Sequence, residues 1–199
     1  AALGLVVVAM PQAARASTDA AWAALKSGGH VLIVRHAQTV PGIGDPPGFR
    51  VDDCATQRNL SEAGRAQSKA MGERLAAAGV RIDEALSSAW CRCLDTARLA
   101  FGRATAYAPL DSFFESRATE PRQTAALRER VRAWQGPGTL ALVTHQVNIT
   151  ALTGEVPAMG EALVLAPGGP AGTEQRHVDV GGDLEGDPAD CGQGGGEVR

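Results

Sequence analysis

Residues 30–39 decide the fold of this chain, and they read His30-Val31-Leu32-Ile33-Val34-Arg35-His36-Ala37-Gln38-Thr39. Their four consecutive β-branched or leucyl residues, 31–34, are typical of a short strand buried on both faces, as in a parallel sheet. The strand ends in two polar side chains, Arg35 and His36. In an open α/β sheet, ligands bind outside the carboxyl ends of the strands. We therefore expect Arg35 and His36 to lie in a ligand site.

A second stretch, residues 139–145, repeats this design, because Thr139-Leu140-Ala141-Leu142-Val143-Thr144 is an apolar run that ends in His145. Arg92 follows Ser87 and Ser88 at the junction between a predicted strand and a predicted helix. Free backbone N–H groups and the helix dipole favour an anion at such a junction. The two histidines and the two arginines together predict a phosphate pocket.

The remaining pattern indicates one α/β domain, since 199 residues are enough for one full core. Further strands are expected at 80–88, 105–110 and 162–166. Helices are expected from Ser17 or Thr18 to Lys26, from a Ser61 N-cap to Gly79, at 119–134 and at 147–152. Residues 40–59 are rich in proline and glycine and carry Asp45, Asp52 and Asp53. A loop of this length is usually functional, and we expect it to form a wall of the pocket.

The bulk composition excludes some classes of partner. The net charge is −3 and only 4% of the residues are aromatic, so no general basic or base-stacking surface for nucleic acid or anionic membrane is expected. The sequence contains no P-loop and no Gly-x-Ser-x-Gly elbow, which argues against nucleotide hydrolases and esterases. It does not indicate an oligomeric state.

The two ends of the chain differ from its centre. Leu3 to Met10 is apolar, and Ala14-Arg15-Ala16 follows it. This pattern predicts a signal peptide, residues 1–16, cleaved after Ala16, and hence a periplasmic or secreted protein; the alternative is an ordinary apolar N-terminal helix. The run is too short for a membrane span. The domain is expected over 17–167, and the glycine-rich, acidic tail 168–199 is expected to be mostly disordered and without a catalytic role.

Export makes the four cysteines relevant: Cys54, Cys91, Cys93 and Cys191. A disulfide from Cys54 to Cys91 or Cys93 would close a loop of nearly forty residues and contribute roughly 4 kcal/mol. The sequence does not fix the pairing, and small buried thiols are the alternative.

Four blocks of this sequence resemble the motifs of the histidine phosphatase superfamily, which includes the phosphoglycerate mutases. In order they are Val34-Arg35-His36-Ala37-Gln38-Thr39, residues 60–67, residues 87–97 and Val143-Thr144-His145. The resemblance covers roughly residues 29–166. It implies a three-layer α/β sandwich with a mostly parallel central sheet flanked by helices.

The resemblance also implies roles for individual residues. His36 is the expected nucleophile that becomes phosphorylated, and Arg35, Arg92 and His145 are expected to bind the transferring phosphoryl group. Thr39 matches a position near the phosphate. The general acid is expected at Glu115, with Asp111 and Asp52 as the alternatives. No metal or cofactor is expected, because adjacent arginines would repel a cation bound by His36, His145 and the Asp52-Asp53 pair.

The expected activity is therefore that of an exported, metal-independent phosphomonoesterase acting on a small phosphorylated substrate. Arginine pairs bidentately with phosphate, and a neutral imidazole can attack phosphorus if its other nitrogen is held as a donor. Two alternatives remain open: a non-catalytic phosphate-binding protein on the same fold and, among enzymes, a phosphomutase.

Overall fold

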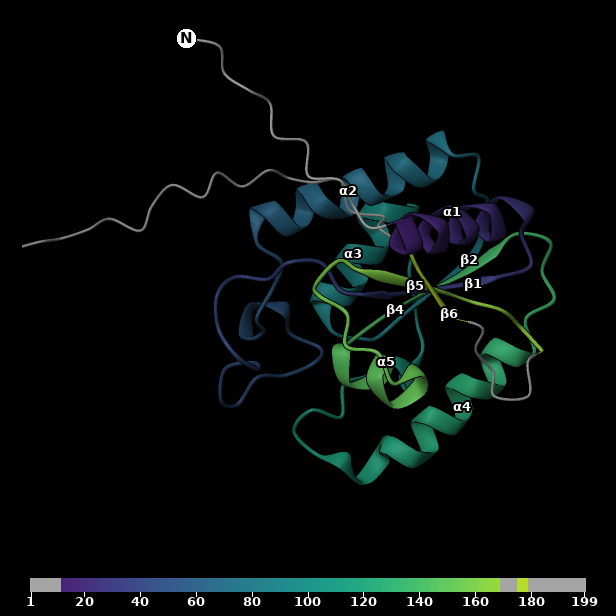
Figure 1. Cartoon of the computed structure of the whole chain (residues 1–199). Coiled ribbons are helices and arrows are strands. Elements are labelled where there is room, and N and C mark those ends of the chain that lie inside the picture. The colour runs from purple at the N-terminus through teal and green to yellow at the C-terminus, as the bar shows by residue number, and fades with distance from the viewer. Residues whose placement is uncertain (1–11, 169–174, 179–199) are drawn as a thin grey trace, which may run out of the picture.

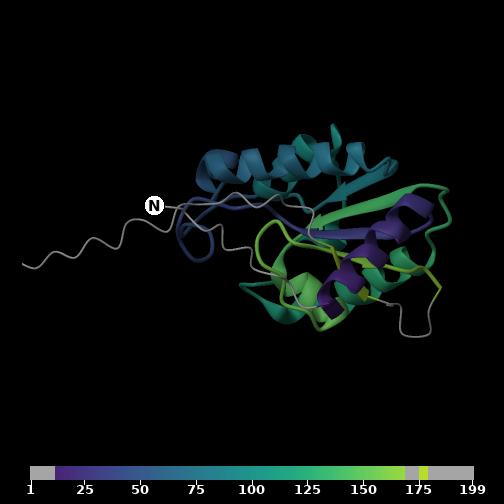
Figure 2. The same ribbon diagram turned by 45° about the horizontal axis from the view of Figure 1, so that its top comes forward.

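The computed structural model describes residues 12–168 and 175–178, which form a six-stranded sheet between two layers of helices (Figures 1 and 2). The strands lie in the order β3-β2-β4-β1-β5-β6. Their bounds are β1 Val31–Arg35, β2 Ile82–Ser87, β3 Thr105–Ala106, β4 Thr139–Thr144, β5 Ala162–Leu165 and β6 Gln175–Val178. The pairs β1–β4, β4–β2 and β2–β3 are parallel, whereas β5 and β6 add to one edge antiparallel. The predicted fold class is confirmed.

Both faces of the sheet are covered by helices. On one face lie α1 (Gln12–Ser27), α2 (Glu62–Ala77) and α3 (Cys91–Phe101), and on the other α4 (Glu120–Arg132) and α5 (Gln146–Thr153) (Figure 1). The side chains of β1 alternate between these layers. Leu32 and Val34 pack in the core on the α1–α3 side, and Val31 and Ile33 in the core on the α4–α5 side. All four are fully buried, as predicted for a central strand.

Helix α2 begins where the sequence predicts. The Ser61 hydroxyl accepts a hydrogen bond from the Gly64 N–H at 3.1 Å, and it forms the N-cap. A Cβ at Gly64 would come 1.9 Å from the carbonyl oxygen of Gln38, so only glycine allows this close approach. The start of α2 is thereby packed against the segment that follows His36.

Three expectations about the elements differ from the structure. Helix α1 begins at Gln12 rather than at a Ser17 or Thr18 cap, because the alanine-rich residues before Ser17 have high helix propensity. The strand expected at 105–110 ends at Ala106, and a 3₁₀ turn follows at Ala108–Leu110. Pro109 has no N–H to donate to a sheet, which favours the turn.

The third difference concerns the C-terminal tail. Residues 175–178 form β6, which pairs with β5 in the register Ala162↔Val178 to Leu165↔Gln175. The edge of β5 presents backbone groups that a further strand can satisfy. The predicted signal segment up to residue 11, and the tail beyond Val178, lie outside the described residues. None of the helices in the described ranges has the length and apolar character that a membrane crossing requires.

Candidate active site

The two histidines singled out in the sequence meet because their strands are neighbours. Strands β1 and β4 are parallel and pair Arg35 with Thr144, so His36 and His145 both follow at the carboxyl edge of the sheet. The His36 N–H donates to the Thr144 carbonyl oxygen at 2.9 Å. The two imidazole rings lie edge to face, with centroids 5.5 Å apart.

The His36 imidazole is held in one orientation and one protonation state. Its side chain is buried, and its Nδ1 lies 2.9 Å from the carbonyl oxygen of Ala37. A carbonyl only accepts, so Nδ1 carries the proton and Nε2 keeps its lone pair. Burial, aided by the positive charges of Arg92, Arg35 and Arg58, lowers the pKa of His36 to about 3. The ring is therefore neutral at neutral pH.

His145 is also buried, and polar neighbours hold both of its nitrogens. Its Nδ1 lies 3.5 Å from Nη2 of Arg92, which can only donate, so the proton is assigned to Nε2. Nε2 lies 2.9 Å from the Ser88 hydroxyl, and that hydroxyl lies 3.2 Å from Oδ1 of Asp111. Burial, together with His36 and the arginines, lowers the pKa of His145 well below its usual value.

Three arginines surround the histidines. Arg35 ends β1, and its Nη1 donates to the Pro157 carbonyl at 2.8 Å. Arg92 belongs to the first turn of α3 and is 4% exposed. Arg58, which the sequence analysis did not single out, comes from the loop 40–59 and lines the same cavity. Burial, followed by the charge of Arg92, lowers the pKa of Arg58, whereas the charge of Asp45 acts in the opposite direction.

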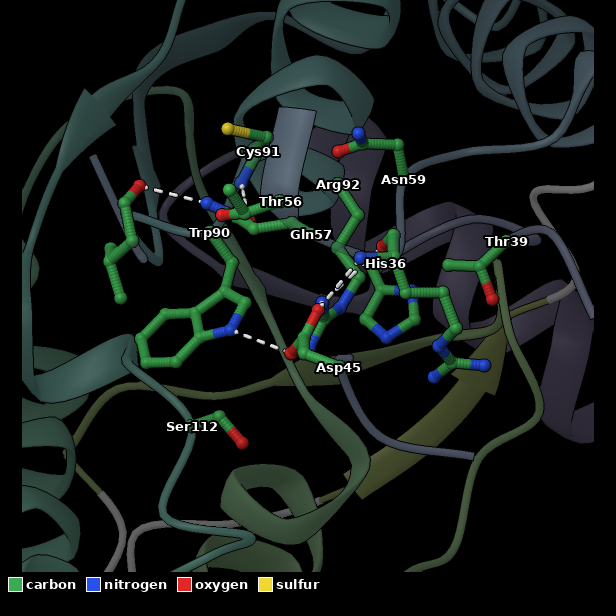
Figure 3. A network of polar contacts seen from close by, with 12 residues as sticks. His36, Thr39, Asp45, Thr56, Gln57, Asn59, Trp90, Cys91, Arg92 and Ser112 are labelled. Atoms are coloured by element: carbon green, nitrogen blue, oxygen red, sulfur yellow. Dashed lines mark hydrogen bonds and ion pairs between the residues drawn. The ribbon is translucent and has the colours of Figure 1, made fainter. Parts of the chain in front are cut away.

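Asp45 is the second residue that sequence reasoning missed as part of the site. Its carboxylate accepts hydrogen bonds from Arg92 Nη1 at 2.7 Å, the Arg58 N–H at 2.9 Å and Trp90 Nε1 at 3.0 Å (Figure 3). Burial alone would raise the pKa of Asp45, but these hydrogen bonds outweigh it and lower the pKa. Asp45 is thus a charged partner that fixes the Arg92 guanidinium beside the histidines.

The loop that carries Asp45 and Arg58 is tied to α3 by a disulfide between Cys54 and Cys91. The sequence left the partner of Cys54 open between Cys91 and Cys93, and the structure selects Cys91. Cys93 is a free, buried thiol whose Sγ lies 3.5 Å from Nε2 of His145. Burial raises the pKa of Cys93 to about 12, so the group is a thiol at neutral pH. Cys191 lies outside the described residues.

The three candidate acids lie in different places. Glu115 is exposed and lines the cavity. Asp111 lies behind His145, where its carboxylate also accepts the Ala89 N–H at 2.7 Å. Asp52 has a side chain that is 85% exposed, pairs with Arg50 at 3.5 Å and does not line the cavity. Of the three, Glu115 alone lines the cavity that His36 also lines.

Thr39 follows His36 by three residues, but it does not line the cavity. Its hydroxyl lies 3.7 Å from Sδ of Met159, and its backbone forms a bridge with Leu60. The metal site considered from the sequence is also not formed, because no group of three histidine, cysteine or acidic residues in the described ranges is arranged to hold an ion.

These residues surround a cavity of about 490 Å³. Its polar floor contains His36, His145 and the three arginines, and its other lining side chains are mixed. The apolar ones are Ile43, Phe49, Val51, Trp90, Phe114, Val147 and Met159, and the polar ones are Asp45, Ser112, Glu115, Ser116, Thr119 and Gln146. Arginines outnumber carboxylates around the cavity, so it favours an anion.

The family model of the histidine phosphatase superfamily (branch 1) matches residues 31–115, a segment that contains Arg35, His36, Arg92 and Glu115. This part of the chain is therefore similar to the superfamily. His145 lies beyond the matched segment, and the pairing of β4 with β1 places it next to His36. No curated protein is detectably similar to the chain in sequence.

Solved structures of several phosphatases share the fold. A mycobacterial glucosyl-3-phosphoglycerate phosphatase in complex with inorganic phosphate has a TM-score of 0.54 and 18% identity, over 75% of this chain and 95% of that one. An α-ribazole-5′-phosphate phosphatase from Escherichia coli, described as putative, has a TM-score of 0.54 and 15% identity, over 75% of this chain and 96% of that one. A phosphohistidine phosphatase SixA from Agrobacterium tumefaciens, also described as putative, has a TM-score of 0.50 and 22% identity, over 75% of this chain and 95% of that one. At identities this low, the structural similarity establishes the fold alone.

Proposed function

We propose that this protein is a phosphomonoesterase that transfers the phosphoryl group of its substrate to Nε2 of His36 and then to water. The observation that carries the proposal is the state of His36: a buried, neutral imidazole whose Nδ1–H is held by the Ala37 carbonyl. The arginines around it supply the positive charge that a phosphate dianion requires. The match of residues 31–115 to the histidine phosphatase model and the names of the structural relatives support phosphatase activity.

In the first step, Nε2 attacks phosphorus as the bond from phosphorus to the ester oxygen breaks. Arg35 and Arg92 are assigned to the charge that spreads over the three equatorial oxygens. Arg92 is suited to this role because Asp45 fixes its Nη1, while its Nη2 faces the His145 ring. His145, whose two nitrogens face Arg92 and Ser88, is assigned to positioning Arg92. The leaving alkoxide takes a proton from the carboxyl group of Glu115.

In the second step, water attacks the phosphohistidine, the bond between phosphorus and Nε2 breaks, and inorganic phosphate leaves. The carboxylate of Glu115 takes a proton from the attacking water, which restores the acid for the next turnover. His36 returns to its neutral form with Nδ1 still bonded to Ala37. The arginines supply the positive charge in both steps, and no metal takes part in the proposed reaction.

The test is hydrolysis of phenyl phosphate in the presence of a chelator. His36→Ala is expected to lower kcat/KM at least about a thousandfold, because the nucleophile is lost. His30→Ala is the matched control, since His30 precedes the other end of the same strand and is expected to leave turnover unchanged. Intact mass spectrometry of the wild-type protein quenched at alkaline pH is expected to show one added phosphoryl group, absent from His36→Ala.

The role of Glu115 is tested with two leaving groups. Phenol is a good leaving group, so Glu115→Gln is expected to change kcat/KM for phenyl phosphate little, because kcat/KM reports only the first step. The same variant is expected to lower kcat/KM for an alkyl phosphate about a hundredfold or more. Phosphate binding without release of phenol by the wild type would instead identify a non-catalytic anion-binding protein. Transfer of the phosphoryl group to an added alcohol in preference to water would identify a mutase.

We also propose that the protein acts in the periplasm or outside the cell. The Cys54–Cys91 disulfide supports this location, because such bonds persist in oxidising compartments. Sequencing the N-terminus of the protein recovered from its native host tests the proposal, since cleavage after Ala16 is expected to leave Ser17 first. Recovery of an uncleaved chain from the cytosol would overturn it.

A further inference from the structure

The mouth of the active-site cavity carries exposed apolar side chains. Large hydrophobic side chains that are clearly exposed number four in the described residues: Val40, Ile43, Phe114 and Val156. Ile43 is 92% exposed and Phe114 58% exposed, and both line the cavity, whereas Val40 and Val156 do not. Single exposed hydrophobic residues are ordinary, but two from different loops at one cavity indicate a binding surface.

The two loops meet at this mouth. The Phe114 ring lies beside Gly44, where an added Cβ would come 3.9 Å from its Cε1. Ile43 therefore belongs to a loop that approaches Phe114 although the two residues are far apart in the sequence. The cavity between them is lined further by Phe49, Val51 and Trp90.

A series of ring contacts links His36 to Phe49, which lines the same cavity as Ile43 and Phe114. The centroid of His145 lies 5.5 Å from that of His36 and 5.4 Å from that of Trp90, and Trp90 lies 5.9 Å from Phe49. The indole is held in place because its Nε1 donates to Asp45 (Figure 3). A group bonded to a phosphate at His36 would thus meet aromatic and aliphatic surface on this side.

We infer that the preferred substrates are phosphomonoesters of alcohols with an apolar alkyl or aryl portion, which lies between Ile43, Phe114, Phe49 and Trp90. This inference rests on the proposed phosphatase function and adds the class of leaving group to it. Apolar contact at the mouth removes the exposed surface of Ile43 and Phe114 from water, which favours binding of such an alcohol. The cavity is also lined by polar side chains, such as Ser112 and Gln146, which could contact a further polar group on the substrate.

The experiment compares n-hexyl phosphate with ethyl phosphate. Their leaving alcohols are nearly equal in acidity, so the ratio of their kcat/KM values reports contact with the added methylene groups. A fully buried methylene favours binding by about fourfold, and half that burial gives about twofold for each group. The wild-type ratio is therefore expected to be at least about tenfold in favour of the hexyl ester.

Variants locate the surface responsible. Ile43→Ser and Phe114→Ser are each expected to reduce the ratio several-fold, because each removes part of the apolar mouth. Val156→Ser is the matched control, since Val156 is 69% exposed but lies away from the cavity, and its ratio is expected to equal that of the wild type. The ratio is insensitive to the fraction of folded enzyme, so a variant with reduced stability still gives a valid result.

The outcomes separate the two proposals. Hydrolysis of both esters with a ratio near one would overturn the inference about the leaving group and leave the phosphatase function standing. Absence of hydrolysis of both esters and of phenyl phosphate would overturn both. A dimer in size-exclusion chromatography that Ile43→Ser dissociates, with an unchanged ratio, would assign the apolar mouth to a second copy of the chain and would also overturn the inference.

Discussion

The pair formed by Asp45 and Arg92 gives the sharpest test of how this site is built. Both side chains are only 5% exposed, and they meet at 2.7 Å. Replacement of Asp45 by asparagine keeps the shape of the side chain but removes its charge. Asparagine offers one oxygen to the three donors, so with that oxygen kept by Arg92 and the Arg58 N–H, the –NH₂ group faces Trp90 Nε1, which loses its acceptor.

Breaking a buried ion pair by removing one partner costs about 3–5 kcal/mol, because the remaining charge is buried without compensation. Arg92 keeps contacts with His145 at 3.5 Å and the Arg58 carbonyl at 3.4 Å and borders a cavity, so the lower end applies. We expect Asp45→Asn to lower the free energy of unfolding by about 3 kcal/mol in urea at pH 7 without phosphate. Saturating inorganic phosphate is expected to narrow the difference from the wild type, since the anion restores a negative charge beside Arg92.

Asp95→Asn is the matched control, and Asp95 lies on α3, the helix that carries Arg92. Asp95 pairs with Arg65 at 3.2 Å, but the side chains are 28% and 48% exposed, so the loss is expected to stay below about 1 kcal/mol. Equal losses in the two variants would refute the assignment of Asp45 as the buried counter-charge. So would phosphate that stabilises Asp45→Asn and the wild type to the same extent.

Two further predictions concern stability. The folded pKa of His36, about 3, lies below the unfolded value of about 6.5, so only the unfolded chain binds this proton between those values. The contribution of this group to stability is complete above pH 6.5 and decreases as the pH is lowered. Between pH 6.5 and 5, the free energy of unfolding measured in urea is expected to fall by about 1.5 kcal/mol more for the wild type than for His36→Asn. The same pH dependence in both proteins would contradict a neutral His36 imidazole. The Cys54–Cys91 disulfide spans 37 residues, so its reduction is expected to destabilise the protein by about 4 kcal/mol. Cys93→Ala, whose thiol is free, is expected to leave the response to reductant unchanged, and an unaltered melting temperature on reduction would rule out the bond.

The sequence was informative where local pattern and final structure obey the same rule. Residues 31–34 form a doubly buried strand because their side chains alternate between two helical layers, each of which needs apolar contacts. The histidines follow at one edge because parallel strands end together. Ser61 caps α2 through its own hydroxyl, a local contact that residue type and spacing suffice to predict.

Asp45 and Arg58 could not be assigned in this way, because they belong to a loop without periodicity. Asp45 depends on Arg92 and Trp90, 47 and 45 residues further along the chain, and nothing in its neighbours Gly44 and Pro46 indicates that contact. The disulfide partner was open for a related reason. Cys91 and Cys93 are two positions apart on α3 and so face different directions, and only the packed structure shows which one faces the loop.

The pairing of β1 with β4 sets the position of the two histidines independently of the loops that line the rest of the cavity. Neighbouring strands lie about 4.8 Å apart, and the ladder between them holds both imidazoles at a spacing fixed by backbone geometry. Most of the other residues that line the cavity come instead from residues 40–59 and 111–119, outside that ladder. Substitutions in these two segments can therefore change which molecules the cavity accepts while His36 and His145 stay in place. Grafting the two segments from a relative onto this sheet is expected to change selectivity without moving the two histidines.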